Sequence, residues 1–510
     1  MEQLFDVLHG FEVITRPTVF LYMVGGFLTG VLFAAIPGLT GTLAIALLLP
    51  VTYTLDISTS LVMCASIFMG GQYGGSITAI TVNIPGAPSA VMTAFEGNIL
   101  MRRGEGANAL RQAALASAFG GVIGAIMLMA LSPFVAKAAL LVQTPGKFSL
   151  ILFALFVIIL SYRAELAKGV IATVLGLMVA TIGIDVASPV ARQTFGIPRL
   201  IEGIDLMAVL IGAFAVNELL SQAGQKYEMH NVFRASGQAI RRREFVPKWS
   251  DVRNIGFFNY LKFGVIGYFV GVLPGAGGSS AAFISYAEAR RSSSRPAEYG
   301  NGSVEGVAAA EGSNNAMCGG SLVPMLSFGI PGDTTSAVIL GVLIINGVQP
   351  GPHLMSTQFE LITPMMAALF ISALLIPIVL MLAGSYYLHL VSINKAILFS
   401  SIAIVAMTGA YVSTFSAFQM ITALIVGVVA YMMRELRYPV VSFLLGFILG
   451  PDLEVYFRRS LAINDGDPMI FITSMDSLFF LAMIGVFFYF MVFRQSSDES
   501  TPEDGAAYKS

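Results

Sequence analysis

The chain has 510 residues, of which 56% are hydrophobic and only 11% are charged, and its formal net charge is −2. A soluble domain carries about 25% charged residues, so this composition excludes a water-soluble globular fold. The small net charge also excludes a bulk electrostatic attraction to nucleic acid.

Long apolar runs follow one another along the chain and predict helices that cross a membrane. Several approach the roughly 20 residues that a bilayer-crossing helix needs. The runs are 150–160, 170–182, 206–216, 366–382, 396–405 and 477–493. The sequence therefore predicts an all-α polytopic membrane protein with about 10–12 membrane segments. It divides into a first transmembrane repeat at 1–222, a cytoplasmic linker at 223–255, a second transmembrane repeat at 256–493 and a polar C-terminal tail at 494–510.

The two halves contain similar glycine- and proline-rich segments in the same order. GVLFAAIPGLTG at 30–41 resembles GVLPGAGG at 271–278, and their Pro-Gly pairs lie 237 residues apart. YGGSITAITVNIPGAPSAV at 73–91 resembles CGGSLVPMLSFGIPGDTTSAV at 318–338, and their Pro-Gly pairs lie 246 residues apart. Two matched segments at nearly equal spacing indicate an internal repeat.

Each Pro-Gly pair interrupts an apolar stretch and predicts a broken helix. Proline removes a backbone donor and clashes with the preceding turn, and glycine adopts the dihedral angles of a break. In lipid, broken helices persist only where protein or a water-filled cavity satisfies the freed backbone groups. Paired interruptions in two halves are typical of transporter binding sites. The alternative is that the pairs are kinks that serve helix packing alone.

The distribution of Lys and Arg predicts the orientation, because cytoplasmic loops are enriched in both. With Arg102 and Arg103 inside, 20 of the 28 basic residues fall inside, among them Arg163, Lys395 and Arg434. Seven fall outside: Arg16, Lys137, Lys147, Arg192, Arg199, Arg458 and Arg459. The hairpin at 20–51 then opens outside, whereas the equivalent hairpin at 257–289 returns inside at Arg290. We therefore expect two inverted structural repeats with re-entrant hairpins. A parallel repeat with full spans in place of hairpins is the alternative.

Seven motifs spread over the chain carry a family resemblance. The first half contains P-G-L-x-G at 37–41, G-G-x-Y-G-G-S-I at 70–77 and N-I-P-G-x-P at 83–88. The second half contains G-V-L-P-G-x-G at 271–277, S-F-G-I-P-G at 327–332, N-G-V-Q-P-G-P at 346–352 and L-G-F-I-L-G-P at 445–451. Together they make residues 20–470 resemble the large membrane subunit, TctA, of the tripartite tricarboxylate transporter family. Thr40-Gly41 departs from the Gly-Pro that relatives often carry there.

The resemblance implies a multi-pass permease subunit in the bacterial cytoplasmic (inner) membrane. It would import tricarboxylates or related organic acids by alternating access, with Na⁺ or H⁺ as the coupling ion and no other cofactor. Two partners are implied: a small membrane subunit like TctB and a periplasmic substrate-binding protein like TctC. A stand-alone ion-coupled carrier or a channel for a different small anion is the alternative.

Three absences in the sequence narrow the class of protein. No Walker motif of the form G-x-x-x-x-G-K-[ST] occurs, which argues against an ATP-binding subunit and fits a gradient-driven process. The four histidines are scattered and show no metal-ligand spacing. No Ser-His-Asp or Cys-His arrangement stands out, so we expect neither catalysis nor a metal site.

A carboxylate substrate needs positive potential inside the membrane, and restarted helices supply it. The first N–H groups of a helix are free and its N-terminus is positive, which makes it an anion site. The predicted substrate-binding residues are residues of the Pro-Gly pairs and the polar side chains near them: Gly38, Thr40, Ser76, Thr78, Asn83, Pro85, Gly86, Gly275, Ser279, Ser280, Asn314, Pro331, Gly332, Thr334 and Thr335. No Lys or Arg is expected near these breaks. For each polar residue alone, the alternative role is helix packing.

Oxygen-bearing side chains near the breaks are candidate ligands of the coupling ion. We predict this role for Asn83, Asn314 and Asp333, since amide and carboxylate oxygens suit Na⁺. Asp333 follows a break, where it equally suits a helix N-cap. Glu305 and Glu311 lie in an Ala/Gly-rich span, and an intramembrane carboxylate is a functional candidate by default. The alternative for these two is a position near the inner surface.

Overall fold

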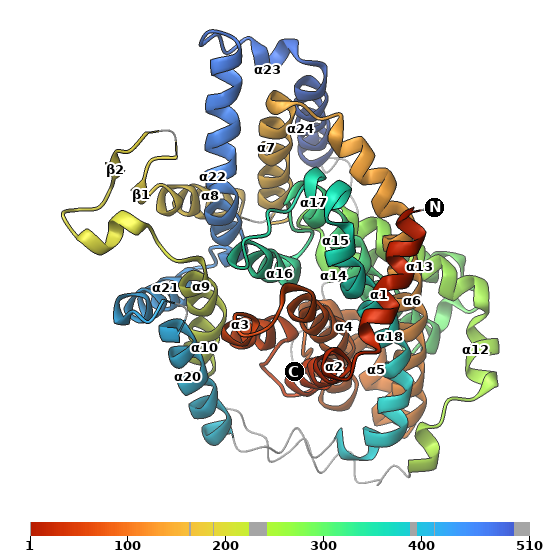
Figure 1. The fold of residues 1–510 in the computed structure, drawn as a ribbon. Helices are drawn as coiled ribbons and strands as arrows, with labels where there is room; N and C mark the ends of the chain where they lie inside the picture. Colours follow the sequence, from red (N-terminus) through yellow and green to blue (C-terminus); the bar gives the residue numbers. More distant parts are fainter. Residues whose placement is uncertain are drawn as a thin grey trace.

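The protein is mainly helical in the computed structural model (Figure 1). The structure describes residues 2–162, 165–186, 188–223, 242–387, 395–412 and 414–493. Residues 224–241 of the predicted linker and the predicted tail at 494–510 lie outside the described residues. The strands it describes are one short antiparallel pair, β1 (Gly183–Ile184) and β2 (Ala191–Arg192). The prediction of a helical protein is therefore confirmed.

Helices break at all four Pro-Gly pairs, as the backbone chemistry of proline and glycine predicts. The first unit consists of α2 (Pro17–Ala34), α3 (Gly41–Thr52), α4 (Ile57–Val82), the 3₁₀ turn η1 (Pro88–Ala90) and α5 (Val91–Arg102). The second unit consists of α13 (Phe257–Val272), α14 (Gly277–Ser292), η7 (Pro296–Glu298), α15 (Val304–Phe328) and α16 (Thr334–Ile345). In the first unit α2 packs along α4, and in the second α13 packs along α15.

The backbone contacts at the second break of each unit recur at the same spacing as the sequence motifs. Gly86 N–H donates to the carbonyl of Gly75 at 3.2 Å, and Gly332 N–H donates to that of Ser321 at 3.3 Å. Each of these donors and acceptors in the second unit lies 246 residues after its counterpart. The same internal geometry therefore closes both breaks. Whether the two units are inverted, and whether their hairpins re-enter the membrane, stay predictions.

The other helices surround the two units. Before and between the units lie α1 (Glu2–Ile14), α6 (Gly106–Leu140), α7 (Thr144–Leu160), α8 (Leu166–Ala180), η3 (Pro198–Glu202), α9 (Leu206–Leu210), the π-helical η4 (Ile211–Val216), α10 (Asn217–Ala223), η6 (Arg242–Phe245) and α12 (Trp249–Ile255). After the second unit come α17 (Pro352–Thr357), α18 (Phe359–Ala383), η8 (Gly384–Tyr386), α20 (Lys395–Val412), α21 (Ala417–Glu435), α22 (Val440–Ile463), α23 (Ile470–Thr473) and α24 (Met475–Phe493).

Six of the described helices are long and apolar enough to cross a membrane, or up to seven if the bent pair Arg243–Ile255 and Phe257–Val272 counts as one span. Six shorter apolar helices accompany them, including Gly41–Thr52 and Thr334–Ile345. The predicted 10–12 segments are therefore not all full-length spans, and two of the shorter helices, Gly41–Thr52 and Thr334–Ile345, follow Pro-Gly breaks. The chain is a multi-pass membrane protein.

One large apolar core joins the two units. Helices of the second unit contact those of the first: α16 contacts α3 and α4, α15 contacts α4 and α5, and α14 contacts η1 and α5 (Figure 1). The long helix α6 lies along α15, and α18 packs against α4 and α6. Because α4 and α15 are buried along almost their whole length, their polar side chains face protein rather than lipid.

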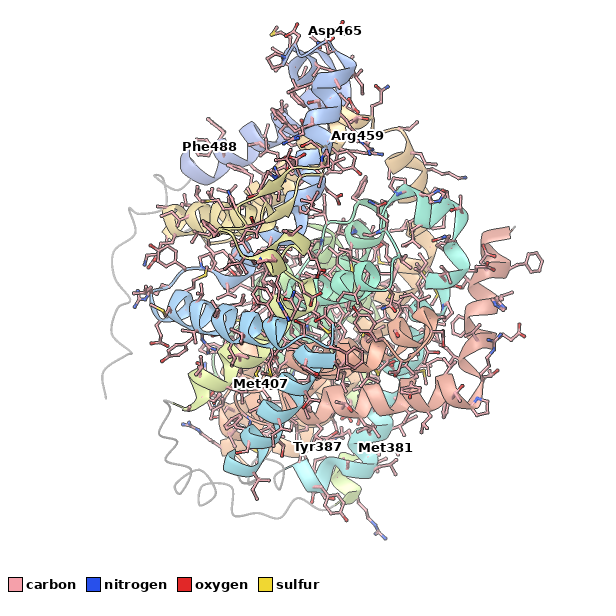
Figure 2. The ribbon with its side chains drawn as sticks, turned by 60° about the vertical axis from the view of Figure 1, so that its left-hand side comes forward. Met381, Tyr387, Met407, Arg459, Asp465 and Phe488 are labelled. Carbon is pink, nitrogen blue, oxygen red and sulfur yellow. The ribbon has the colours of Figure 1, made fainter. Side chains whose placement is uncertain are left out.

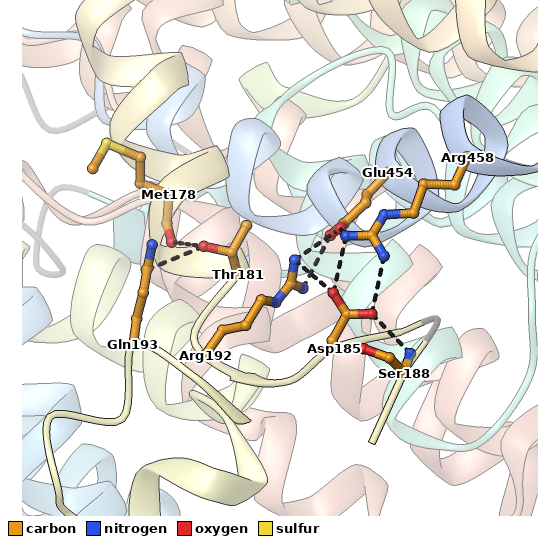
Figure 3. Close-up of polar contacts among 8 residues, drawn as sticks. All are labelled: Met178, Thr181, Asp185, Ser188, Arg192, Gln193, Glu454 and Arg458. Atoms are coloured by element: carbon orange, nitrogen blue, oxygen red, sulfur yellow. Dashed lines mark hydrogen bonds and ion pairs between the residues drawn. The ribbon is translucent and has the colours of Figure 1, made fainter. Parts of the chain in front are cut away.

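An ion-pair network ties the hairpin of β1 and β2 to α22 (Figure 3). Arg192 Nη1 donates to Glu454 Oε1 at 2.8 Å, and Arg458 forms two hydrogen bonds with Asp185 at 3.0 and 2.9 Å. The hydrogen bond from Arg192 to Glu454 raises the pKa of Arg192. The predicted orientation assigns both segments to the outer side, and their contact is consistent with a position on the same side of the membrane.

The two ends of the molecule carry different segments. Figure 2 shows Arg459 and Asp465 at one end and Met381 and Tyr387 near the other. The predicted orientation places the first two outside and the last two near the inner side. These positions agree with one another, and their assignment to the outside and inside stays a prediction.

Residues 242–255 of the predicted cytoplasmic linker fold against the first repeat. Arg111 of α6 donates through Nε to Asp251 of α12 at 2.9 Å and through Nη1 to the carbonyl of Glu244 at 2.6 Å. Both side chains of the Arg111–Asp251 pair are buried. This part of the linker is therefore a packed element of the protein.

Candidate substrate cavity

Three of the four restarted helices, α3, α14 and α16, begin at the wall of one cavity of about 500 Å³, and the turn that leads into the fourth, α5, also lines it. The wall contains the start of α3 (40–43), the approach to α5 (87–89), the start of α14 (275–279) and the start of α16 (333–335). Each of these segments lies at or just after a Pro-Gly pair. The break ends one helix there, and the next helix starts at the cavity wall or after a short turn that lines it. The repeated motifs of both halves thus meet at one place.

The helix N-termini at the cavity differ in how their free N–H groups are satisfied. Thr40 caps α3 by accepting from Leu43 N–H at 3.1 Å. Asp333 caps α16 by accepting from the N–H groups of Thr335 and Ser336 at 3.2 and 2.9 Å. Helix α14, which begins at Gly277, has no side-chain cap. Its first N–H groups and positive dipole end are therefore open to an anion in the cavity.

Six of the predicted substrate residues and one predicted ion ligand line the cavity. They are Thr40, Gly275, Ser279, Pro331, Thr334, Thr335 and Asp333. Among them, Ser279 is exposed to the cavity at the start of the uncapped helix α14. The structure therefore brings together predicted residues from three of the four breaks, and residues 87–89 represent the fourth.

The other predicted substrate residues do not line this cavity. They are Gly38, Ser76, Thr78, Asn83, Pro85, Gly86, Ser280, Asn314 and Gly332. Ser76 and Thr78 are buried and donate their hydroxyls to carbonyls of their own helix, those of Tyr73 and Gly75. Such bonds are typical of small polar residues that serve helix packing.

Gly86 and Gly332 hold the chain against the first helix of each hairpin, α2 in the first unit and α13 in the second. A Cβ at Gly86 would stand 2.0 Å from the carbonyl oxygen of Ala34, and one at Gly332 would stand 2.6 Å from that of Gly271. Their N–H groups are already bonded within the break. Both glycines therefore support the cavity through close backbone packing, and neither presents its backbone to it.

Asn83 ends α4 in the left-handed conformation, with φ of 58°, and it is exposed. Gly329 ends α15 in the same conformation, with φ of 73°, at the equivalent position of the second unit. Asparagine and glycine are the residues that adopt this conformation most readily. The geometry of Asn83 is therefore that of a helix C-cap.

An ion pair in the cavity wall was not expected from the sequence. Arg434, at the end of α21, is the one basic side chain among the described residues that line the cavity. It donates to Glu218 of α10 at 2.8 Å. Glu218 also accepts from Gln222 at 2.6 Å, and Gln222 donates to the carbonyl of Gly38 at 3.1 Å. The expectation that no Lys or Arg lies near the breaks is therefore wrong.

The role of Arg434 in the cavity wall could not be predicted from its sequence position, because Arg434 ends an apolar stretch and is far from every Pro-Gly pair. It then looks like one of many cytoplasmic arginines at a helix end. Only the packing of α21 against α10 and η4 brings it to the cavity. The one available signal was its position next to an apolar helix of the second half, which is too common to be specific.

Comparison with known proteins identifies the family of the chain. The model of the tripartite tricarboxylate transporter TctA family matches residues 20–445. The chain belongs to the TctA family. A relative from Agrobacterium vitis, described as an uncharacterized 52.8 kDa protein in the TAR-I ttuC' 3' region, is 33% identical over 477 residues, which cover 93% of each chain.

A second relative of this TctA-family chain is shorter. It is described as an uncharacterized protein in the TAR-II ttuC' 3' region of Agrobacterium vitis, and it is 35% identical over 208 residues, or 41% of this chain and 86% of the relative. No solved structure matches the chain. Family membership makes this protein a membrane component of a tricarboxylate transporter, a system that comprises other subunits as well.

The cavity of this TctA-family protein also borders an irregular helix. The π-helical segment η4 contributes Ala213 and Phe214 to the wall, and Asn217 follows it directly. Asn217 donates to the carbonyl of Ala213 at 3.0 Å, while its own amide oxygen has no protein partner. π-helical turns are frequent at functional sites. Asn217 therefore adds an unsatisfied acceptor to the wall near Glu218 and Arg434.

Proposed function

We propose that this TctA-family protein is the permease subunit of a binding-protein-dependent secondary transporter that imports small carboxylates, tricarboxylates or related organic acids. A periplasmic binding protein like TctC delivers the substrate, and a small subunit like TctB completes the membrane complex. A gradient of Na⁺ or H⁺ across the bacterial cytoplasmic membrane drives import, and the cavity opens alternately to each side.

The observation that carries this proposal is the convergence of restarted helices on one cavity. Helix N-termini attract anions, and α14 brings such an end to the wall without a side-chain cap. Arg434 adds a guanidinium, which recognises carboxylates through paired hydrogen bonds. A volume of about 500 Å³ falls within the range of small-molecule pockets, about 300–1,000 Å³.

Within this proposal the predicted residues take two roles. Those that line the cavity contact the substrate, with Ser279, Thr334 and Thr335 as hydroxyl donors next to the helix starts. The residues of the breaks that lie behind the wall keep the helix starts in place: Gly38, Ser76, Thr78, Asn83, Pro85, Gly86, Ser280 and Gly332. Asp333 combines its cap with a position in the wall, where its carboxylate favours a cation over an anion.

The residues at the cavity also suggest which side it faces. Tyr162, Glu218 and Arg434 line it, and the predicted orientation assigns the ends of their helices to the cytoplasm. We assign this conformation to the inward-facing state. In it, Glu218 occupies the guanidinium of Arg434, so an arriving carboxylate exchanges with Glu218 and a departing one restores the pair.

Uptake by the complete complex tests the proposal. The chain, its small subunit and its binding protein are reconstituted into liposomes, and radiolabelled di- and tricarboxylates are supplied outside. We expect uptake that requires the binding protein and collapses when the Na⁺ and H⁺ gradients are dissipated. Counterflow separates the alternatives: a carrier exchanges internal for external substrate, whereas a channel only leaks it. Uptake that needs neither the gradient nor the binding protein contradicts the proposal.

A further inference from the structure

A carboxylate without a counter-charge lies inside the helix bundle, apart from the cavity wall. Glu311 of α15 is fully buried. Its Oε1 accepts from the hydroxyl of Thr93 in α5 at 2.5 Å, and its Oε2 accepts from that of Ser117 in α6 at 3.1 Å. No ion pair to Glu311 is found among the described residues. Burial of an uncompensated carboxylate is costly, so this site favours a bound positive charge.

A second buried carboxylate shows what a structural role looks like. Glu96 of α5 is also fully buried, but it accepts from three backbone N–H groups, those of Gly300, Gly302 and Ser303, and from the hydroxyl of Tyr286. Four donors fix the loop that leads into α15. Glu311 has only two hydroxyl donors, each of which can rotate to present an oxygen lone pair to a cation instead.

Unsatisfied amide groups adjoin Glu311 on the same helix. Asn314 is fully buried, and neither its amide oxygen nor its amide nitrogen has a hydrogen-bond partner. The amide oxygen of Asn315, also fully buried, has none either. Residues three and four positions apart share a helix face. Buried polar groups are almost always paired in native proteins, so these unpaired amide oxygens indicate a place where a ligand binds.

The polar cluster reaches the wall of the cavity through Asn314. Its amide oxygen lies 2.6 Å from where a Cβ on Gly278 would stand, and the Cβ of Ser89 lies 2.8 Å from the same point. Ser89 donates its hydroxyl to Gln72 at 2.9 Å. Gly278, Ser89 and Gln72 all line the cavity. Polar residues of both units therefore extend from the cavity wall to Asn314, which lies three residues from Glu311 on the same helix face.

We propose that Glu311, Asn314 and Asn315, with the hydroxyls of Thr93 and Ser117, form the site that binds the coupling cation, and that this cation is Na⁺. Carboxylate, amide and hydroxyl oxygens are the ligands that hard cations prefer. A bound Na⁺ neutralises the charge of Glu311 and is coordinated by the amide oxygens of Asn314 and Asn315. The ion would thereby link α15 to α5, α6 and α14. The coupling role of this site rests on the proposed transport function, whereas its binding of Na⁺ does not.

Thermal unfolding of the purified complete chain tests binding without transport. NaCl is compared with choline chloride at constant ionic strength and pH. We expect Na⁺ to raise the midpoint of the wild type, Glu311→Gln to abolish this rise, and Thr93→Val to require about tenfold more Na⁺ for it, since one oxygen ligand of the ion is lost. Thr93→Val preserves the side-chain shape, so it decides the question if Glu311→Gln fails to fold.

Glu305→Gln is the matched control, because Glu305 lies in the first turn of the same helix and accepts from the hydroxyl of Ser293. It should keep the full response to Na⁺. A wild-type midpoint that responds to pH but not to Na⁺ overturns the sodium assignment. A response to Na⁺ that survives both Glu311→Gln and Thr93→Val overturns the site.

Transport by the reconstituted complex then tests coupling. We expect Glu311→Gln to lose substrate accumulation driven by a Na⁺ gradient while it retains substrate exchange, which needs no net ion movement. Accumulation at the wild-type level in this variant overturns the coupling role. If the wild type neither accumulates nor exchanges any carboxylate but binds Na⁺ through Glu311, the proposed transport function fails and the cation site stands.

Discussion

The side-chain hydroxyls of Thr42 and Thr335 hydrogen-bond to each other at 2.7 Å, although 293 residues separate them. Thr42 lies in the first turn of α3, and Thr335 lies in the first turn of α16. Each helix is the one that restarts after a Pro-Gly pair, and the two pairs belong to different halves of the chain. The contact therefore joins the two repeated units at the wall of the cavity.

Cysteines in place of these two threonines should form a disulfide. Hydroxyl oxygens 2.7 Å apart place the Cβ atoms near the roughly 3.5–4.5 Å that a disulfide needs. We expect oxidation of Thr42→Cys/Thr335→Cys, with Cys64 and Cys318 replaced by Ala, to give the linked peptides by mass spectrometry. Thr29→Cys/Thr335→Cys is the control, because Thr29 lies in α2 and bonds to Gly25. The control pair should give no link, and absence of the link in the Thr42→Cys/Thr335→Cys pair would show that the two helix starts are apart.

The sequence was enough to predict the breaks and their equivalence in the two units, because both follow from local chemistry and from the repeat. Proline and glycine end a helix wherever they fall in an apolar stretch. Matched breaks such as Gly86 and Gly332 then have to be packed in equivalent ways, and the repeated hydrogen bonds to Gly75 and Ser321 show that they are. Helix boundaries near the breaks could therefore be predicted within a few residues.

The roles of individual residues were harder to predict, since they depend on which face of a break turns to the cavity. The sequence treats Gly275 and Gly332 alike, yet Gly275 lines the cavity and Gly332 packs against Gly271 and Ser321. Arg434 enters the wall through contacts between helices far apart in sequence. No local pattern encodes such contacts, so only the tertiary packing reveals them.

Arg434→Gln should reduce transport severely. If the guanidinium binds a substrate carboxylate, its loss removes charge-assisted hydrogen bonds worth about 1.5–3 kcal/mol each, which corresponds to about 10–100-fold in apparent affinity. Arg434→Lys should recover only part of this, because Lys lacks the planar fork of donors. The measurement is the concentration dependence of uptake by the reconstituted complex, normalised to protein abundance.

Arg437→Gln is the control for Arg434, since Arg437 lies just beyond α21, is 84% exposed and stands 3.9 Å from Glu165. Exposed ion pairs contribute about 0–1 kcal/mol, so uptake should stay near the wild-type level. Equal losses in both variants would mean that positive charge at this end of α21 matters for topology or folding rather than for substrate.

Gly86→Ala and Gly332→Ala should lower the amount of folded protein more than the affinity for substrate. A methyl group would overlap backbone oxygens that cannot move without the helix, at 2.0 and 2.6 Å, and overpacking costs about 1–3 kcal/mol or more. Gly25→Ala is the control, because nothing lies within 4 Å of a Cβ there. Membrane abundance and gel-filtration profiles measure the effect; abundant variants with selectively weakened substrate binding would place both glycines at the substrate.

Asn83→Gly should leave transport unchanged, and Asn83→Ala should destabilise the protein by about 1–2 kcal/mol, the cost of the left-handed conformation for an ordinary L-residue. The reason is that Asn83 has φ of 58° and lies outside the cavity wall. Uptake kinetics and the thermal midpoint are measured for both variants. A weakened apparent affinity for substrate or Na⁺ in Asn83→Gly would instead support a ligand role for the amide.

Accessibility of two loops tests the inverted arrangement of the units. The loop after α3 contains no Lys or Arg and should face outside, whereas the last turn of α14 contains Arg290 and Arg291, so the loop after α14 should face inside. Thr54 and Ser294 suit a cysteine, since both are exposed; their neighbours Asp56 and Ser293 are engaged, Asp56 as the cap of α4 and Ser293 with Glu305. In intact cells, a membrane-impermeant thiol reagent should label Thr54→Cys, and it should reach Ser294→Cys only after the cells are opened. Labelling of both from the same side would favour a parallel repeat and would remove the assignment of an inward-facing cavity.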